Sequence, residues 1–265
     1  MDLIKYTEAN RKAWNEAMPY HKKVMDEKWD AMFTDPKFIF QKDQELDELN
    51  TIGIKGKRIA HLSCNNGIEL MSLKRMGASR CVGFDISDNA IVEATARAEK
   101  FEIESEFIRT DVLEISEEFY NQFDLVYITV GALVWIPDRK KYFEKVANLL
   151  VEGGHLFIYE HHPFGNVLPY DDEFDGELKI IHKYFDKEIW EEFGGIDYYG
   201  GEPYKSSPSY EFPYTVSELL NLIAESGFCL QKFNEYENDI ALGRSYMEKQ
   251  EIKFPLSYIL VANKL

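Results

Sequence analysis

The chain has 265 residues, of which 45% are hydrophobic, and its formal net charge is -17. This apolar fraction suffices for one large core, or for a core with an added cap. So negative a chain repels a phosphate backbone, which argues against a nucleic-acid substrate and favours neutral or cationic small molecules.

From Tyr6 to about Asn50, large apolar residues recur at roughly helical spacing, and Pro36 interrupts the run. Residues 1–50 are therefore predicted to form two or three helices that act as a lid. Beyond them, short apolar runs alternate with amphipathic segments. The predicted strands are Arg58–Ser63, Arg80–Phe84, Glu106–Thr110, Phe123–Thr129 and His155–Tyr159, and the helices between them are Ile68–Met76, Asn89–Phe101 and Arg139–Leu150.

The end of the chain completes this pattern after an irregular stretch. Residues 163–213 are crowded with tyrosine, phenylalanine and tryptophan, and so long a segment without structure is improbable. We predict an aromatic-rich cap that covers the active site and contacts the substrate. Thr215–Gly227 then reads as a helix, and Phe228–Glu235 and Pro255–Asn263 read as two closing strands.

The alternation predicts an α/β fold: a Rossmann-like, mainly parallel, seven-stranded sheet with helices on both faces. Residues 51–265 would form this domain, with the cap inserted before the last helix. In such sheets the ligand crevice lies beyond the carboxyl ends of the strands. We therefore expect the functional residues on the loops that follow the strands.

The loop after the first predicted strand is Ser63-Cys64-Asn65-Asn66-Gly67, within IAHLSCNNGIELMSL (residues 59–73). A ligand can approach such a turn of small and polar residues closely. The dinucleotide fingerprint GxGxxG needs three glycines, and this loop has one, which disfavours NAD and FAD. Taken alone, the loop is also compatible with an ordinary strand–helix junction.

Two acids follow the next strands. Asp85 ends the second strand about twenty residues after the loop, where an acid can accept hydrogen bonds from both ribose hydroxyls. Asp111 follows the third strand, where it can accept from an adenine amino group while Val112 supplies an apolar edge. A solvated loop residue or a helix cap is the alternative for each acid. Their combination indicates a nucleoside site.

The ordered set of IAHLSCNNG, GFDIS, DV and FDLVYITVGALVWIPD…LLVEGGHLFIYEHHPF resembles the class I S-adenosylmethionine (SAM)-dependent methyltransferases over residues 58–162. The first motif of that family usually reads VLDLGCGxG; here His61 replaces the aspartate, and Ser63 and Asn65 replace two glycines. Asparagine tolerates positive φ best after glycine, so Asn65 or Asn66 is predicted to preserve the turn. The resemblance is closer to a branch with a Cys-Asn-x-Gly loop.

The resemblance implies a site for S-adenosyl-L-methionine, with S-adenosyl-L-homocysteine as product. The resemblance places the methionine part of SAM at Ser63, Cys64 and Gly67, the ribose at Asp85, the adenine at Asp111 and Val112, and the edge after strand four at Thr129. Asn65 and Ile86 are also predicted to bind the cofactor. Tyr20 and His21 would line the pocket from the lid, with a plain surface helix as the alternative.

The acceptor side is less defined. Trp135, Tyr199 and Tyr210 are predicted to contact the substrate, although plain packing explains them too. The fifth strand ends in Glu160, His161 and His162, the candidate general bases. Alternatively, the two histidines cap the strand and anchor the cap. Two groups have non-catalytic interpretations: His61 as a core histidine, and the acids Glu45, Asp47 and Glu48 as a solvated face.

We therefore expect a SAM-dependent methyltransferase that moves a methyl group to a small molecule by in-line displacement. A SAM-binding regulatory module without turnover and, less favoured, a nucleotide-dependent oxidoreductase are the rivals. Cys64, Cys81 and Cys229 lack the Cys-x-x-Cys spacing of a zinc site, and the start MDLIKYTEANRKAWNEAM lacks a signal peptide's apolar core. The expectation is a cytoplasmic monomer or homodimer with no metal, nucleic-acid or membrane partner.

Overall fold

The computed structural model describes residues 3–199 and 204–265. The chain begins with two helices, α1 (Ile4–Phe33) and α2 (Asp43–Ile52). The other helices are α3 (Ile68–Arg75), α4 (Asp88–Lys100), α5 (Arg139–Leu149) and α6 (Val216–Glu225), with short 3-10 helices η1 (Val112–Glu114), η2 (Glu117–Phe119), η3 (Leu133–Trp135), η4 (Pro163–Val167) and η5 (Ser245–Lys249). The strands are β1 (Arg58–Leu62), β2 (Arg80–Asp85), β3 (Glu106–Arg109), β4 (Phe123–Thr129), β5 (Leu150–His161), β6 (Trp190–Glu192), β7 (Ser209–Glu211), β8 (Phe228–Tyr236) and β9 (Ser257–Lys264).

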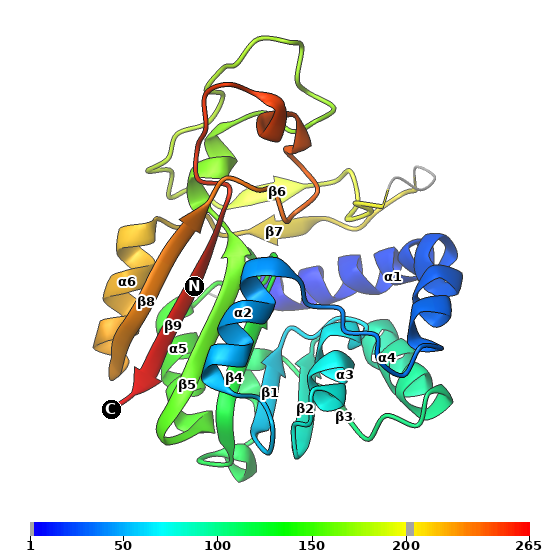
Figure 1. Cartoon of the computed structure of the whole chain (residues 1–265). Helices are drawn as coiled ribbons and strands as arrows, with labels where there is room; N and C mark the ends of the chain where they lie inside the picture. Colours follow the sequence, from blue (N-terminus) through cyan, green and yellow to red (C-terminus); the bar gives the residue numbers. More distant parts are fainter. Residues whose placement is uncertain (1–2, 200–203) are drawn as a thin grey trace.

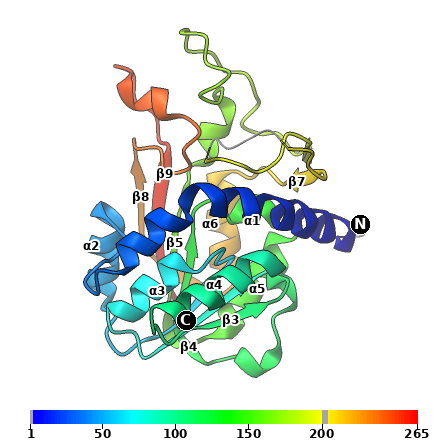
Figure 2. The ribbon, with the colours of Figure 1, turned by 90° about the vertical axis from the view of Figure 1, so that its right-hand side faces the viewer.

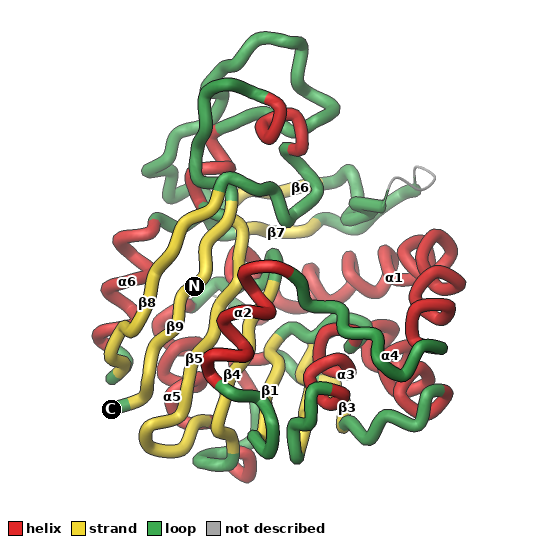
Figure 3. Tube along the Cα trace, viewed as in Figure 1, coloured by secondary structure: helices red, strands yellow, loops and turns green. Residues whose placement is uncertain are grey.

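Seven of the strands form one sheet in the order β3-β2-β1-β4-β5-β9-β8 (Figures 1 and 3). Strands β1 to β5 pair in parallel, and β9 runs antiparallel to both β5 and β8. The predicted mainly parallel, seven-stranded α/β sheet is thereby confirmed. The chain moves outward from β1 to β3 and then returns to the other side of β1 at β4, so a topological switch point lies between β1 and β4.

Helices cover both faces of this sheet, and β4 shows how the sequence divides between them. Leu125 and Tyr127 pack toward the side of α2 and α3, while Val126 and Ile128 pack toward α5 and α6. All four are fully buried. A strand that buries both of its faces reads as a continuous apolar run, which is why β4 was recognisable in the sequence.

Helix α1 lies across the carboxyl ends of the strands, between α4 and β7 (Figure 2). It is tied to α4 through buried Arg97, whose guanidinium contacts Asp26 and Asp30 of α1 at 2.5 and 3.3 Å. The predicted two or three N-terminal helices are thus one 30-residue helix and the shorter α2. Any ligand at the carboxyl edge is covered by α1.

The predicted cap segment, residues 163–213, rises above this edge and holds η4 and the β6–β7 hairpin (Figure 1). Residues 200–203 of it lie outside the described residues. A second excursion, residues 237–256 between β8 and β9, packs against it through Leu168, Tyr246 and Met247. Sequence reasoning missed this part of the cap. Among residues 3–199 and 204–265, no helix combines the length and apolarity that a membrane span requires.

Candidate functional site

The loop after β1 has the unusual backbone that the sequence predicted. Asn65 has a φ of 48° and Gly67 a φ of 74°, so asparagine does stand in a left-handed position that glycine usually fills. Ser63 has a φ of 57°, which was not foreseen. Gly67 is the N-cap residue of α3, and its N–H donates to the carbonyl of Cys64 at 3.0 Å. The loop is a compact turn that presents backbone to the crevice.

Two glycines let the neighbouring strands pack against this loop. A Cβ on Gly67 would lie 2.5 Å from the ring of Phe107, on β3, and 3.0 Å from Ala94. A Cβ on Gly83, in β2, would lie 2.7 Å from Sγ of Cys64. Cys64 is itself buried, and burial raises the pKa of its thiol, so it acts as a packing residue and not as a thiolate.

Asp85 is joined directly to the loop. Its Oδ2 accepts from the N–H of Asn65 at 2.8 Å, and its Oδ1 accepts from the N–H of Ser87 at 2.8 Å. Burial raises the pKa of Asp85, while these N–H donors oppose the rise. The acid at the end of β2 and the loop after β1 therefore form one unit at the switch point.

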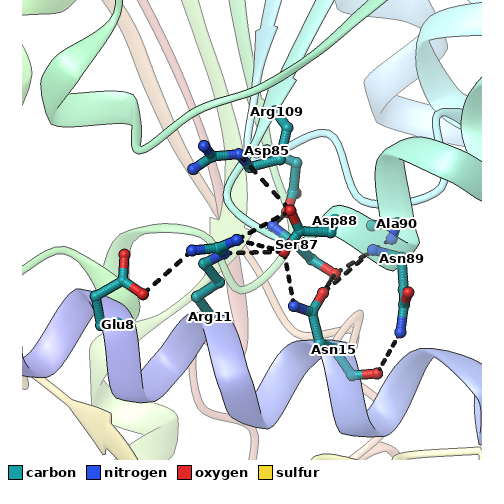
Figure 4. A network of polar contacts seen from close by, with 9 residues as sticks. All are labelled: Glu8, Arg11, Asn15, Asp85, Ser87, Asp88, Asn89, Ala90 and Arg109. Atoms are coloured by element: carbon teal, nitrogen blue, oxygen red, sulfur yellow. Dashed lines mark hydrogen bonds and ion pairs between the residues drawn. The ribbon is translucent and has the colours of Figure 1, made fainter.

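Helix α1 is fastened over this unit by a polar network (Figure 4). Arg11 donates to both carboxylate oxygens of Asp88, at 2.9 and 3.0 Å. Asn15 donates to Asp88 at 2.8 Å and accepts from the Ser87 hydroxyl at 2.8 Å. The hydrogen bonds from Arg11 and Asn15 hold the pKa of Asp88 at about 2, which keeps the network charged at neutral pH.

The predicted adenine and ribose residues lie along the same edge. Asp111 is the N-cap of η1 and accepts from the N–H of Leu113 at 2.9 Å, so the helix-cap alternative describes its present contact. Val112 is buried, and Ile86 is half-buried beside Asp85. None of these contacts tests the adenine role of Asp111, which stays a prediction.

The hydroxyl of Thr129, at the end of β4, contacts two side chains that flank the first loop, an imidazole and a carboxylate. It donates to Oε2 of Glu69 at 2.8 Å and lies 3.0 Å from Nε2 of His61. His61 is fully buried, and burial lowers its pKa to about 3, which keeps the imidazole neutral. It is a core histidine, as its place in an apolar strand indicated. Burial also raises the pKa of Glu69, in the first turn of α3, to about 7.

A second buried acid lies behind this group, and the sequence had suggested a solvated face there. Glu45 of α2 is 6% exposed and accepts a hydrogen bond from the Tyr127 hydroxyl. Burial and the nearby charge of Glu69 raise the pKa of Glu45 to about 8. The interpretation of Glu45 as a solvated residue is therefore wrong, because α2 turns this residue toward the sheet. Gln41 completes the group by donating to the carbonyl of Glu69 at 2.9 Å.

The three candidate bases at the end of β5 have different surroundings. Glu160 is fully buried, and its carboxylate accepts from the N–H groups of Gly131 and Leu133, in the loop after β4. Burial alone would raise the pKa of Glu160, but His161 and these donors hold it below its usual value. Nδ1 of His161 lies 2.9 Å from Oε1 of Glu160. A carboxylate so held is a poor proton acceptor, and it is well placed to orient the imidazole beside it.

The side chain of His162 has other partners than that of His161. Its Nδ1 accepts from the N–H of Phe164 at 3.0 Å, which caps η4, and its Nε2 lies 2.9 Å from Oε1 of Glu235 on β8. Burial lowers the pKa of His162, although Glu235 opposes this. These contacts match the strand-capping alternative for His162.

An aromatic cluster joins α1, the cap and the loop after β4. The ring of Trp14 lies 5.5 Å from that of Trp135 and 6.2 Å from that of His21, which in turn lies 5.1 Å from the ring of Tyr199. His21 is buried, and its Nε2 lies 2.8 Å from the carbonyl oxygen of Ile196. Predicted cofactor and substrate residues, His21, Trp135 and Tyr199, are thus brought together through Trp14, which the sequence did not single out.

Tyr20 and Tyr210 lie apart from this cluster. Tyr20 stacks on Tyr204 of the cap at 4.2 Å. Tyr210 packs against Tyr6 at 4.9 Å, near the start of α1, and exchanges two hydrogen bonds with the side chain of Asn10. Both contacts attach the cap to α1.

A parallel sheet with a tight turn after its first strand and an acid at the end of the next is the arrangement found in nucleoside-binding α/β domains. Comparison with known proteins shows which family of such domains this chain resembles. A family model described as a methyltransferase domain matches residues 59–154. Residues 59–154 are thus similar to a methyltransferase domain, and they include β1 from its second residue, β2 to β4 and the start of β5.

Curated relatives are similar in sequence over part of the chain, and solved structures share its fold. The Ubiquinone biosynthesis O-methyltransferases of Acinetobacter baylyi and Alkalilimnicola ehrlichii are 27% and 29% identical to the chain. Each match covers 40% of this chain and 44% or 42% of the relative, so the chain spans less than half the length of these relatives. A SAM-dependent methyltransferase from Mesorhizobium loti superimposes with a TM-score of 0.63 at 22% identity, covering 83% of this chain and 97% of the other. One from Methanosarcina mazei gives 0.60 at 19%, covering 82% and 97%.

Proposed function

We propose that this chain is a SAM-dependent methyltransferase that transfers a methyl group to a small-molecule acceptor and releases S-adenosyl-L-homocysteine. The observation that carries the proposal is the unit formed by the first loop and Asp85 at the switch point, where Asn65 donates to Oδ2 of Asp85 at 2.8 Å. We also propose that the protein is cytoplasmic and is a monomer or homodimer. The three cysteines are free, two of them buried, which supports the cytoplasmic location.

The residues at this edge fit SAM in shape and chemistry. Gly67 lets the first loop pack tightly against Phe107, and the start of α3 leaves backbone N–H groups without helical partners beside the loop. Asp85 keeps lone pairs that ribose hydroxyls could use, and Val112 offers an apolar edge for adenine. The strand β1 acid of the usual motif is replaced by neutral His61, and Oε2 of Glu69 lies 3.7 Å from Nε2 of this histidine. We assign to Glu69 the contact with the methionine ammonium.

When bound, SAM would supply a methyl group already activated on a positively charged sulfur. The protein must then align the acceptor and exclude water. Trp14 and Trp135 pack edge to face beside the loop after β4, and an indole face in this position would favour a nearby cation. Helix α1 and the cap close the edge above them.

An acceptor hydroxyl must also lose its proton. His161 is the base that the geometry favours, because Oε1 of Glu160 lies 2.9 Å from its Nδ1 and this carboxylate would stabilise the imidazolium formed when His161 accepts a proton. The carboxylate of Glu160 also fixes Gly131 and Leu133. One buried side chain would thus position both the base and the loop beside it.

The rival functions make different predictions. A SAM-binding module without turnover would bind the cofactor and methylate nothing, and its motivation is the altered first loop. A nucleotide-dependent oxidoreductase would bind NADH, which the single glycine of the loop disfavours. Quenching of tryptophan fluorescence by SAM and by NADH separates these ligands, since Trp14 and Trp135 lie beside the edge.

The decisive experiment incubates the protein with methyl-labelled SAM and a small-molecule cell extract, and identifies the labelled product by mass. Asp85→Asn should weaken SAM binding about 10- to 100-fold, because an amide loses the charge that the ribose hydroxyls would meet. Asp124→Asn is the matched control: Asp124 pairs with Arg58 near the opposite end of the sheet. Equal affinities for the two variants would contradict the assignment of Asp85.

A further inference from the structure

Two acids beside the first loop have no charged partner in the described part of the chain. Glu45 is 6% exposed, while Glu69, in the first turn of α3, keeps 22% of its side chain accessible. Glu45 accepts a hydrogen bond from the hydroxyl of Tyr127, and Glu69 accepts one from the hydroxyl of Thr129. No lysine or arginine nitrogen of the described residues lies within 4.0 Å of either carboxylate.

The two acids belong to one cluster of polar side chains. Nε2 of Gln41 donates to the Tyr127 hydroxyl at 3.3 Å and to the carbonyl of Glu69 at 2.9 Å. The rings of Tyr127 and His61 lie 4.8 Å apart, and Nε2 of His61 lies 3.7 Å from Oε2 of Glu69. Gln41 is 2% exposed, and its Oε1 has no hydrogen-bond partner among the described residues. Beside Glu45 and Glu69, the cluster therefore keeps an acceptor that no donor of these residues satisfies.

Other deeply buried acids of the protein are compensated. Glu93 is 6% exposed and contacts Arg97 at 2.9 Å, and Glu160 accepts from two backbone N–H groups of the loop after β4. A buried carboxylate without such partners takes up a proton, because burial penalises its charged form. Burial accordingly raises the pKa of Glu69 to about 7 and that of Glu45 to about 8. A cation that arrives at such an acid favours its ionised form again.

We propose that the ammonium group of the cofactor binds at Glu69 and displaces the proton of this acid, so that cofactor binding releases a proton. The inference rests on the proposed SAM site. The O–H bond of Glu69 breaks and its proton passes to solvent, while the ammonium keeps its protons and donates an N–H to the new carboxylate. Glu45 is the more buried acid and keeps its proton at neutral pH, because the ionised Glu69 repels a second negative charge.

The groups around the two acids do not titrate between pH 6 and pH 8. Burial raises the pKa of the neutral side chains within their electrostatic reach, namely the thiol of Cys64 and the phenols of Tyr127, Tyr159, Tyr198 and Tyr199. Burial lowers the pKa of His61 to about 3. The pKa of Glu160 is held below its usual value, and its negative charge helps to raise the pKa of Glu69. On α2, Glu48 is paired with Lys232 of β8.

Calorimetric titration of the full chain tests the inference with two ligands. These are S-adenosyl-L-homocysteine and 5′-methylthioadenosine, which keeps the nucleoside and lacks the amino acid. For an acid with a pKa of about 7, the affinity for S-adenosyl-L-homocysteine should rise about 10-fold from pH 6 to pH 8. Two buffers of different ionisation enthalpy should show that about 0.9 proton is released per ligand at pH 6. The affinity for 5′-methylthioadenosine should stay the same.

The outcomes separate this inference from the proposed function. Equal pH dependence for the two ligands, or binding of S-adenosyl-L-homocysteine without proton release, overturns the inference while the chain still binds the cofactor. A chain that binds S-adenosyl-L-homocysteine at neither pH overturns the proposed function as well. Because both ligands are compared on the wild-type chain, this part of the test does not depend on the folding of a variant.

Variants then identify the acid that exchanges the proton. Glu69→Gln should weaken binding of S-adenosyl-L-homocysteine at pH 8 about 10-fold and abolish the proton release, with 5′-methylthioadenosine bound as by wild type. Glu45→Gln is the matched control, because it imitates the protonated acid and should keep the release at pH 6. If the release persists in Glu69→Gln, with or without its loss in Glu45→Gln, the proton does not come from Glu69 and the proposal is wrong.

Discussion

The two halves of the carboxyl edge are built by different means. On the side of β1 and β2, the shape is set by backbone: Ser63, Asn65 and Gly67 have positive φ, and Asp85 is bonded to backbone N–H groups. On the side of β5 and the cap, it is set by side chains from distant segments, such as His162 after β5 and Glu235 of β8. Changes of backbone freedom should therefore damage the first half most, and changes of side-chain chemistry the second.

The largest effect is expected at Gly67. Gly67→Val places a β-branched residue at a φ of 74° and brings its Cβ against Phe107, which should lower the free energy of unfolding by about 4 kcal/mol and abolish SAM binding. Gly227→Val is the matched control, because its φ is 82° and nothing lies within 4 Å of the added Cβ. It should cost only about 1–2 kcal/mol. Urea unfolding and calorimetric titration with SAM measure both effects, and Gly67→Ala serves if the valine variant does not fold.

The second half is tested at His161. His161→Ala should lower kcat about 100-fold for a hydroxyl acceptor, because the proposed proton acceptor is gone. His162→Ala should leave kcat within about 3-fold and cost about 1 kcal/mol of stability, because it removes the cap of η4. Equal loss of kcat in both variants would contradict the division of roles between the two histidines.

Between the halves lies the buried acid Glu45, which predicts a pH dependence of stability. Its folded-state pKa is about 8 against an ordinary value of 4.5, so between these values the folded protein keeps a proton that the unfolded chain releases. The contribution of Glu45 to the free energy of unfolding is therefore greatest below about pH 4.5 and is lost as the pH rises toward 8.

Glu45→Gln imitates the protonated acid. Between pH 5.5 and pH 8, the free energy of unfolding should therefore fall by about 1–2 kcal/mol less in this variant than in the wild-type protein. Asp47→Asn, on the exposed side of α2, should not change this difference. Unfolding in urea at the two pH values measures it. Parallel pH curves for wild type and Glu45→Gln would mean that Glu45 titrates normally.

The smallest effect is expected at Asn65. Asn65→Gly relieves a positive φ of 48° but loses the hydrogen bond from the N–H of Asn66 to Oδ1 at 2.7 Å, so stability should change by less than about 0.5 kcal/mol and the affinity for SAM by less than about 3-fold. Asn65→Ala loses the hydrogen bond and keeps the unfavourable φ, and should cost about 1–2 kcal/mol. If the glycine variant binds SAM worse than the alanine variant, the loop does not act through its backbone shape.

The features that the sequence predicted lie mainly on the side of the carboxyl edge that the backbone shapes. The strands β1 to β5 and the turn at Asn65 were predictable because apolar runs and the backbone preference of asparagine are local properties. Positive φ at Ser63 was not, since serine rarely adopts it without tertiary constraint.

The buried polar residues show the limit of local reasoning. Glu45 was misassigned and Arg244 was not noticed, because burial of a charged residue depends on which way its helix or loop faces in the fold. Trp14 lies on α1 at ordinary core spacing, and only the fold brings it to Trp135. Among the polar residues that sequence reasoning missed, Glu69 did carry a signal in the sequence, as an acid in the first turn of the helix after the loop.

Helix α1 is attached to both halves at once. Arg11 and Asn15 bond to Asp88 at the start of α4, while Asn10 bonds to Tyr210 of the cap hairpin. A movement that uncovers Asp85 must therefore carry the hairpin along or break the pair between Asn10 and Tyr210. In an enzyme that exchanges its cofactor at this edge, departure of the spent cofactor and release of the methylated product would be mechanically coupled, and the order of the two events would be determined by which attachment of α1 breaks first.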